Sequence, residues 1–351
     1  MILLIVLLIV VAGCAKEDEA KKQESKFHQV KTPKLEPFYS FNVTKLNNQS
    51  YISLEELSEK GNIKYQFDEI NRVLTLIESQ MHYRLVYGVP VYEKNLEYVP
   101  TQRNHLSIIE NKPYISIAFL DKEIEWVVKP EGKSTVKISM GGKKDEIPVS
   151  ASPTRPTSVE EIISQLSVLE NPISGAKVST IRSHLPGAPR NYRNGTHEGL
   201  DFYQYGTNVA INPNTPVYGM GEGKIIRIDH DYRGYSSIEE RNKDLSIASN
   251  TEVTPEFILD KLRGKQVWVY YPNGILARFA HLDRVAEDLS VGDNVTNETV
   301  IGYVGNSGTS GEVLKNSTEY HLHLDLLIYN ELFWEGLGNE EVITILTTVF
   351  E

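Results

Sequence analysis

The stretch Tyr320-His-Leu-His-Leu-Asp325 carries two histidines that are separated by one leucine. In a β-strand, side chains two positions apart point to the same face of the sheet. We therefore expect His321 and His323 to face one common space. One of them is able to bind a metal ion there while the other lies beside it, so the stretch predicts a strand at a metal site.

A second group of candidate ligands lies upstream, in His197-Glu-Gly-Leu-Asp201. Catalytic zinc usually takes three histidine or carboxylate ligands and keeps a fourth position open. His197, Asp201 and one histidine of the downstream pair make such a set. Gly195 and Gly199 disfavour a helix here, and an extended chain also aligns positions four apart. Either pattern alone arises often by chance, and most histidines bind no metal.

Three more segments complete the pattern: Thr215-Pro-Val-Tyr-Gly-Met-Gly-Glu-Gly223, Phe279-Ala-His-Leu282 and Gly302-Tyr-Val-Gly-Asn-Ser-Gly-Thr-Ser-Gly311. With the two ligand groups they form five motifs whose order resembles the M23 family of metallopeptidases, the lysostaphin and LytM type. The resemblance covers roughly residues 183–329. It implies a mainly β catalytic domain with a lysostaphin-like antiparallel core. It also implies a zinc-dependent endopeptidase that hydrolyses peptide cross-links of bacterial peptidoglycan.

The resemblance implies roles for individual residues. His197, Asp201 and His323 match the zinc ligands. His321 matches the histidine that acts on water at the zinc, and His281 matches a second catalytic histidine that stabilises the oxyanion. The chemistry is consistent, because zinc lowers the pKa of water, one imidazole is able to take up a proton, and another is able to donate to developing negative charge.

Two carboxylates adjoin the motifs. Asp325 stands where the family commonly has a glutamate, and a carboxylate there is able to orient a zinc ligand, although aspartate is shorter. Glu198 matches no functional residue of the family, so we expect a surface carboxylate.

The C-terminal region, residues 171–351, alternates strand-like segments with glycine-rich turns, as in Val217–Ile228, Gln266–Tyr271 and Leu276–Ala280. Short strands at this spacing predict an antiparallel β-core. Residues 130–170 are expected to form a linker and a connecting helix. Ser158 is the predicted N-cap of that helix, Val159–Leu169.

Two segments are longer than compact members of the family require: residues 233–264 and 312–319. In the first, Thr254 as N-cap, Pro255 in the first turn and Gly264 as the stop predict a helix with an apolar face. The charged residues of this helix are expected to face water: Glu256, Asp260, Lys261 and Arg263. We expect the insertions to wall the cleft and limit which peptides enter; surface decoration is the alternative for the larger one.

Residues 38–129 are rich in strand signals with short helical pieces. Tyr51-Ile-Ser-Leu and Tyr114-Ile-Ser-Ile form a weak repeat, each followed by a leucine at the same offset. The region resembles the small domain at the N-terminus of copper amine oxidases, which implies a smaller α+β domain and no metal site. A hairpin is expected around residues 68–71.

The segment 1–14 is too short to span a bilayer, which takes about 20 residues, and has the length of a signal-peptide core. Val11-Ala-Gly-Cys14 resembles the lipobox of bacterial lipoproteins, which implies cleavage before Cys14 and a lipid on its thiol. Residues 15–37 then tether the protein to the outer face of the cell membrane. An ordinary signal peptide with an incidental cysteine is the alternative. One feature departs from the pattern, because no Lys or Arg precedes the apolar run.

The formal net charge of -11 argues against nucleic-acid binding, which needs a basic face to neutralise phosphates. The expected partners are a peptidoglycan peptide and, through the lipid, the membrane. Two other functions stay open. One is a catalytically silent M23-like module that binds or regulates cell-wall hydrolases. The other is the substrate-binding lipoprotein of a transporter, which explains the lipobox but not the histidines.

Overall fold

The computed structural model of the chain describes residues 37–61, 63–78, 80–101, 103–140 and 153–351. The predicted lipidation site, Cys14, and the predicted tether up to residue 36 lie outside these ranges. Within them, no helix combines the length and the apolar character that crossing a membrane requires.

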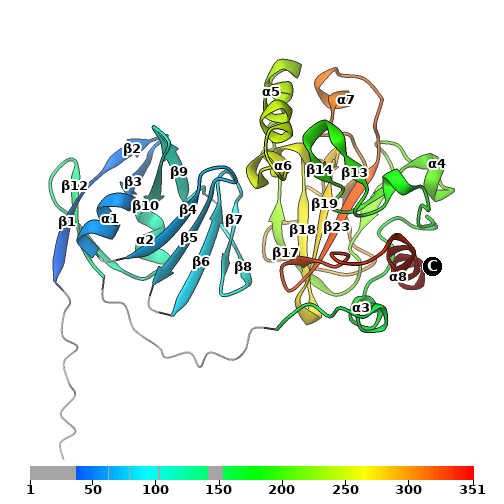
Figure 1. The fold of residues 1–351 in the computed structure, drawn as a ribbon, viewed down its shortest axis with the longest axis horizontal. Helices are drawn as coiled ribbons and strands as arrows, with labels where there is room; N and C mark the ends of the chain where they lie inside the picture. The colour runs from blue at the N-terminus through cyan, green and yellow to red at the C-terminus, as the bar shows by residue number, and fades with distance from the viewer. Residues whose placement is uncertain (1–36, 62, 79, 102, 141–152) are drawn as a thin grey trace, which may run out of the picture. The chain divides into compact units, whose positions relative to one another are not determined.

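The described residues between 37 and 140 form three antiparallel sheets and two short helices (Figure 1). The strands are β1 (Phe38–Asn42), β2 (Thr44–Leu46), β3 (Gln49–Ser53), β4 (Lys64–Asp68), β5 (Val73–Glu78), β6 (Met81–Val86), β7 (Val91–Lys94), β8 (Glu97–Pro100), β9 (Leu106–Ile109), β10 (Lys112–Ser116), β11 (Val127–Pro130) and β12 (Thr135–Ser139). The helices are α1 (Leu54–Gly61) and α2 (Ile117–Lys122). The strand orders are β1-β12-β11, β2-β3-β10-β9 and β4-β5-β6-β7-β8.

The weak sequence repeat corresponds to a structural repeat. Strand β3 runs directly into α1, and β10 runs directly into α2. The two strands also pair with each other, with Ile52 opposite Ile115. The predicted hairpin is confirmed, since β4 and β5 pair antiparallel around residues 69–72. Strand β12 lies within the stretch expected as linker and pairs with β1 and β11.

Residues 153–351 are built around a second set of antiparallel sheets. The strands are β13 (Pro189–Arg190), β14 (Gly195–Thr196), β15 (Leu200–Phe202), β16 (Pro216–Tyr218), β17 (Gly223–Ile228), β18 (Val267–Tyr271), β19 (Ile275–Ala280), β20 (Arg284–Val285), β21 (Asn294–Val295), β22 (Val300–Tyr303), β23 (Leu322–Ile328) and β24 (Glu331–Leu332). The main sheet has the order β15-β23-β19-β18-β17-β21, and a small sheet has the order β16-β22-β20. The predicted mainly β, antiparallel core is therefore confirmed.

Short helices surround this core. The α-helices are α3 (Val159–Leu166), α4 (Gln204–Thr207), α5 (Ile238–Ser249), α6 (Glu256–Leu262), α7 (Ser310–Val313) and α8 (Asn339–Phe350), and the 3-10 turns are η1 (Arg182–His184), η2 (Asn191–Arg193) and η3 (Pro272–Gly274). The N-cap predicted for α3 is confirmed, because the Ser158 hydroxyl accepts from the Glu161 N–H at 3.3 Å. Figure 1 shows α3 and α8 beside one another, and both contribute buried residues to the same core.

The insertion helix α6 forms, but its predicted cap does not. The position before Glu256 is Pro255, which makes no side-chain cap. The Thr254 hydroxyl instead accepts from Arg193 Nη1 at 2.7 Å. Threonine is a suitable N-cap by residue type, but here its hydroxyl is hydrogen-bonded to the buried guanidinium of Arg193 in η2. The helix therefore begins two residues after Thr254.

Candidate metal centre

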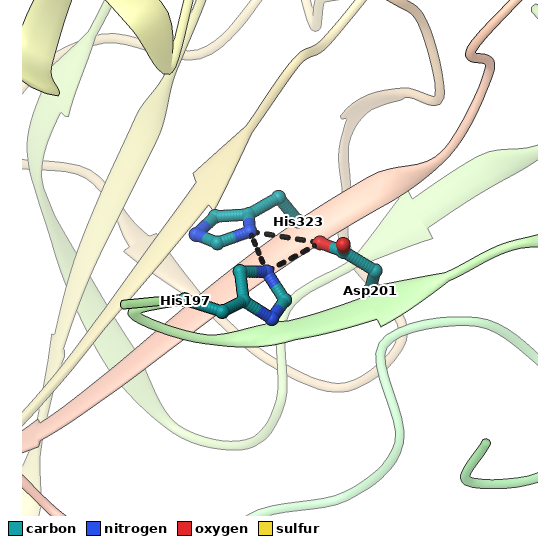
Figure 2. Close-up of side chains that lie close together, drawn as sticks. All are labelled: His197, Asp201 and His323. Carbon is teal, nitrogen blue, oxygen red and sulfur yellow. Dashed lines mark hydrogen bonds and ion pairs between the residues drawn. The ribbon is translucent and has the colours of Figure 1, made fainter. Parts of the chain in front are cut away.

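The pairing of β23 with its two neighbours brings the predicted ligands to one level of the main sheet. His323 pairs with Asp201 of β15 on one side and with Ala280 of β19 on the other. His197 lies in the turn between β14 and β15. Figure 2 shows the side chains of His197, Asp201 and His323 pointing toward one another. The structure thus brings the three predicted zinc ligands together.

The facing atoms of these side chains form a nearly equilateral triangle. His197 Nε2 is 2.9 Å from Asp201 Oδ1 and 3.0 Å from His323 Nδ1, and the last two atoms are 2.9 Å apart. On the outer side, His197 Nδ1 lies 2.9 Å from the Leu185 carbonyl oxygen, and His323 Nε2 lies 2.6 Å from Asp325 Oδ1. Since a carbonyl or carboxylate oxygen accepts, each neutral histidine donates its proton outward. The inward nitrogen of each ring therefore carries a lone pair.

Three electron-pair donors thus meet with no proton of their own between them. A buried group of this kind needs a positive charge at its centre. Ligand atoms about 2.0–2.2 Å from a tetrahedral zinc ion lie about 3.3–3.6 Å apart, so a slight opening of the triangle accommodates the ion. Two histidines and one carboxylate, each histidine held by an outer partner, are a typical donor set for catalytic zinc. The residues fit the metal.

The electrostatics of the triangle also favour a cation. Burial lowers the pKa of His323, but Asp325 and Asp201 outweigh burial and raise it to about 9. Burial raises the pKa of Asp201, but His197 and His321 outweigh burial and hold it well below its usual value. Both shifts favour positive charge beside the ionised Asp201 carboxylate, which a proton on His323 or a bound zinc ion would supply.

Two further histidines face the same space. His321 donates from Nδ1 to the Glu319 carbonyl oxygen at 2.7 Å, and its Nε2 lies 3.6 Å from Asp201 Oδ1. His281 follows β19 in the left-handed region, with φ 58°, and donates from Nδ1 to the Ser307 carbonyl oxygen at 2.7 Å. The two ring centroids are 4.6 Å apart. The geometry thus brings both predicted catalytic histidines beside the ligand triangle.

Residues 202–333 match the model of Peptidase family M23. The matched segment contains His281, His321 and His323 and begins one residue after Asp201. No curated protein matches the sequence of this chain. Similar solved structures include the catalytic domain of the antimicrobial peptidase lysostaphin from Staphylococcus simulans, with 21% identity over 45% of this chain and 82% of that chain and a TM-score of 0.26. Another is a zinc-containing peptidase from Vibrio cholerae, with 12% identity over 86% of this chain and 71% of that chain and a TM-score of 0.30.

The matched segment holds its two catalytic candidates in the neutral form. Burial, reinforced by His321 and His323, lowers the pKa of His281 well below its usual value. Burial also lowers the pKa of His321, against the opposing effect of Asp201. With Nδ1 already donating, the Nε2 atom of each neutral ring is an acceptor. This suits His321 to take a proton from water, whereas an oxyanion-stabilising role for His281 requires a second proton on that ring.

Close backbone approach explains the glycine between the two upstream ligands. A Cβ on Gly199 would lie 2.1 Å from the Leu324 carbonyl oxygen and 2.8 Å from Asp325 Oδ1. Any side chain there would push the ligand-bearing turn away from β23. Glu198, expected on the surface, instead accepts from buried Arg193 at 2.7 and 3.0 Å. The expectation of a surface carboxylate was wrong, because its partner Arg193 lies outside the motif 197–201.

The cleft that contains the histidines is also lined by both insertions. The larger insertion contributes Arg241 of α5 and Leu259 and Leu262 of α6, and the second insertion contributes Glu319. The larger insertion is therefore part of the cleft wall, and surface decoration remote from the site is ruled out for it. The charged residues of α6 were only partly predicted. Asp260 and Arg263, expected to face water, instead form ion pairs inside the protein.

Two site residues were missed from the sequence. Tyr203 stacks on His321 with ring centroids 4.2 Å apart and an interplanar angle of 11°. Arg190 donates from Nη2 to Asp201 Oδ2 at 3.2 Å. Tyr203 had a usable signal, because it lies two positions after a predicted ligand in an extended segment. Arg190 carries no such signal in the sequence, because only the folded chain brings it next to Asp201.

Proposed function

We propose that this chain is a zinc-dependent endopeptidase that hydrolyses peptide cross-links of bacterial peptidoglycan. The observation that carries the proposal is the inward-facing triangle of His197, Asp201 and His323, in which outer hydrogen bonds leave every facing atom as an electron-pair donor. Two more histidines stand beside it with Nε2 directed at the cleft. The match to Peptidase family M23 supports the same activity.

The three ligand residues would hold zinc, which supplies Lewis acidity and makes water more acidic. Side chains of the protein then transfer the proton of the attacking water. His321 Nε2 accepts it from the attacking water and delivers it to the nitrogen of the leaving amine. The Nδ1 bond to the Glu319 carbonyl and the stacked ring of Tyr203 keep His321 in one orientation for both transfers.

His281 supplies the second imidazole. Its Nδ1–H remains bound to the Ser307 carbonyl oxygen, so the ring does not rotate when Nε2 gains a proton. Nε2 takes up a proton from solvent when the substrate binds, and the resulting Nε2–H donates to the oxyanion as negative charge develops on the carbonyl oxygen of the substrate. This proton stays on the ring until the products leave. A low pKa before the reaction and a donor role during it are thus compatible.

We further propose that Cys14 carries a lipid and that the protein acts at the outer face of the cell membrane. The support is the lipobox-like Val11-Ala-Gly-Cys14 at the end of an apolar run. The charged stretch that follows would give the peptidase domain reach toward the wall.

The deciding experiment is a digestion of purified sacculi by the zinc-loaded full chain, with the released fragments identified by mass spectrometry. Peptides with new amino and carboxyl ends at a cross-link are expected, and His321→Ala is the matched control. Binding to sacculi without release by the zinc-loaded protein would contradict the endopeptidase proposal. That result would favour the silent module that regulates other cell-wall hydrolases.

A further inference from the structure

The end of helix α6 is joined to the metal centre by a chain of three buried side chains. Arg263 Nε donates to Asp325 Oδ2 at 2.8 Å, and Asp325 Oδ1 accepts from His323 Nε2 at 2.6 Å. The side chain of Asp325 is 0% exposed, and those of Arg263 and His323 are 8% and 6% exposed. At this depth, solvent competes little with either bond, so both fix orientation.

The same arginine reaches a catalytic histidine through its backbone. The Arg263 carbonyl oxygen accepts from the backbone N–H of His281 at 2.8 Å. The next residue, Gly264, has φ 69°, and a Cβ there would lie 2.3 Å from the carbonyl carbon and oxygen of Ser307. That Ser307 oxygen is the acceptor of His281 Nδ1. The C-terminal end of α6 therefore abuts the supports of a ligand histidine and of a catalytic one.

Helix α6 is itself firmly seated. Its Asp260 pairs with Arg227 of β17, which is buried. On the other side, the buried residues Phe257, Ile258 and Leu262 pack in one apolar cluster with Ala248 of α5. These contacts fix the position from which Arg263 reaches the metal centre.

We propose that Arg263 is a positioning residue for zinc binding, through which the 233–264 insertion supports the metal centre. Arg263 holds Oδ2 of Asp325, which turns Oδ1 toward His323 Nε2 and directs His323 Nδ1 at the ion. Without the guanidinium, Asp325 loses a charged partner and the carboxylate is released from this orientation. The inference rests on the proposed zinc site and does not depend on peptidase activity.

The test measures the zinc affinity of the full chain by competition with a chelating indicator. Arg263→Gln is expected to weaken zinc binding about 10–100-fold, the usual effect of losing an outer partner of a metal ligand. Arg155→Gln is the matched control: it removes another largely buried arginine, whose side chain pairs with Glu331 and donates to backbone carbonyl oxygens, with no bond to helix α6 or to Asp325. We expect it to keep the wild-type zinc affinity. Wild-type affinity in a folded Arg263→Gln variant overturns the proposal.

A double-mutant cycle tests the route through Asp325. Arg263→Gln added to Asp325→Asn is expected to weaken zinc binding no further than Asp325→Asn alone. Fully additive losses would show that Arg263 acts by another route and would overturn the proposal. The visible absorption of the cobalt-loaded protein gives a second readout, expected to change in Arg263→Gln and to stay unchanged in Arg155→Gln.

Folding is checked by circular dichroism before each titration. If Arg263→Gln does not fold, Arg263→Lys replaces it, because lysine keeps the charge but lacks the Nε–H fork that binds Asp325. Its zinc affinity is expected to be several-fold weaker than that of the wild type, and an unchanged affinity overturns the proposal. A wild-type protein that binds no zinc would refute the proposed function itself, so the two failures are distinguishable.

Discussion

Nδ1 of His281 lies 2.7 Å from the carbonyl oxygen of Ser307, and this contact places the proton of a neutral ring on the nitrogen that points away from the cleft. His321 has the same arrangement with the Glu319 carbonyl. Neither histidine contributes an atom to the ligand triangle of His197, Asp201 and His323. The proposed function therefore gives metal binding and proton transfer to different side chains, which single substitutions are able to separate.

We expect His281→Ala and His321→Ala each to retain the wild-type zinc content. The rate of sacculus digestion should fall about 10²–10⁴-fold, the usual contribution of a positioned acid or base. Zinc is measured by atomic absorption and the rate by release of soluble peptides. His82→Ala changes an exposed histidine of β6 and serves as the control, with activity unchanged. Loss of zinc from His281→Ala would show that His281 is a ligand.

Removal of zinc is expected to destabilise the protein. A ligand that binds only the folded state adds about 2.7 kcal/mol at a free concentration 100 times its Kd. The thermal midpoint should therefore fall on chelation and return when zinc is added back. His323→Ala deletes one corner of the triangle, so its midpoint should not respond to zinc. A zinc response in His323→Ala equal to that of the wild type would refute the ligand assignment.

The sequence was sufficient to pick out the three residues that the fold brings together, but not the groups that hold them in place. His197, Asp201 and His323 are recognisable because each carries a metal-binding side chain inside a motif. The partners of the histidines are largely backbone carbonyls, such as those of Leu185 and Ser307. Every residue has a carbonyl, so no residue type marks these partners. The antiparallel core was predictable for the opposite reason, since short strands between glycine turns are a local signal.

The larger insertion shows where local reasoning failed. Its α6 helix was predicted, but Asp260 and Arg263 were expected in water because charged residues are rarely buried without a partner. Their partners, Arg227 and Asp325, lie on two strands of the main sheet, and only the fold brings them together. Helix α5 was missed, although the Ser237 hydroxyl accepts from the N–H three residues on, a cap that the sequence Ser-Ile-Glu-Glu signals.

The buried Asp260–Arg227 pair predicts a stability that depends on pH. Burial raises the pKa of Asp260, but Arg227 outweighs burial and leaves the pKa below its usual value. A carboxyl whose pKa is lowered by folding contributes stability above its unfolded pKa of about 3.9, and that contribution disappears as pH falls through the folded pKa. Asp260→Asn should therefore cost about 1.5–3 kcal/mol at pH 7, the range for a hydrogen bond to a charged group.

Urea unfolding at pH 7, 5 and 3 measures this effect. The gap between wild type and Asp260→Asn should be full at pH 7 and 5 and smaller at pH 3. Asp283→Asn breaks an exposed pair with Arg284 and is the control, with a change under about 0.5 kcal/mol throughout. A gap that stays constant down to pH 3 would mean that the charge of Asp260 contributes no stability.

Membrane attachment is expected to depend on Cys14. A lipid anchor adds about 0.8 kcal/mol of membrane affinity per buried methylene, so an acylated protein should sediment with membranes. Cys14→Ala should leave the protein unprocessed or release it, as judged by fractionation and by the mass of the N-terminal peptide. Cys14→Ser is a closer match in size and should behave in the same way. An unmodified cysteine in a soluble wild-type protein would refute the anchor.

Arg241 of α5 brings positive charge from the insertion to the cleft. Its Nε donates to the Gly308 carbonyl oxygen at 3.1 Å, which holds the side chain against the turn that also carries Ser307. Among the described residues no hydrogen-bond partner is found for its Nη atoms, and the side chain lines the same pocket as the histidines. The guanidinium is therefore placed to bind a carbonyl or carboxylate of the substrate.

We expect Arg241→Ala to raise KM about 10-fold or more, because a hydrogen bond to a charged group contributes about 1.5–3 kcal/mol. The kcat and the zinc content should change little, since a contact made equally with bound substrate and transition state affects binding alone. Kinetics with isolated cross-linked muropeptides measure both constants. Lys243→Ala removes an exposed charge from the same helix outside the cleft lining and is the control, with KM unchanged. Equal constants for Arg241→Ala and Lys243→Ala would show that α5 walls the cleft without selecting the peptides that enter it.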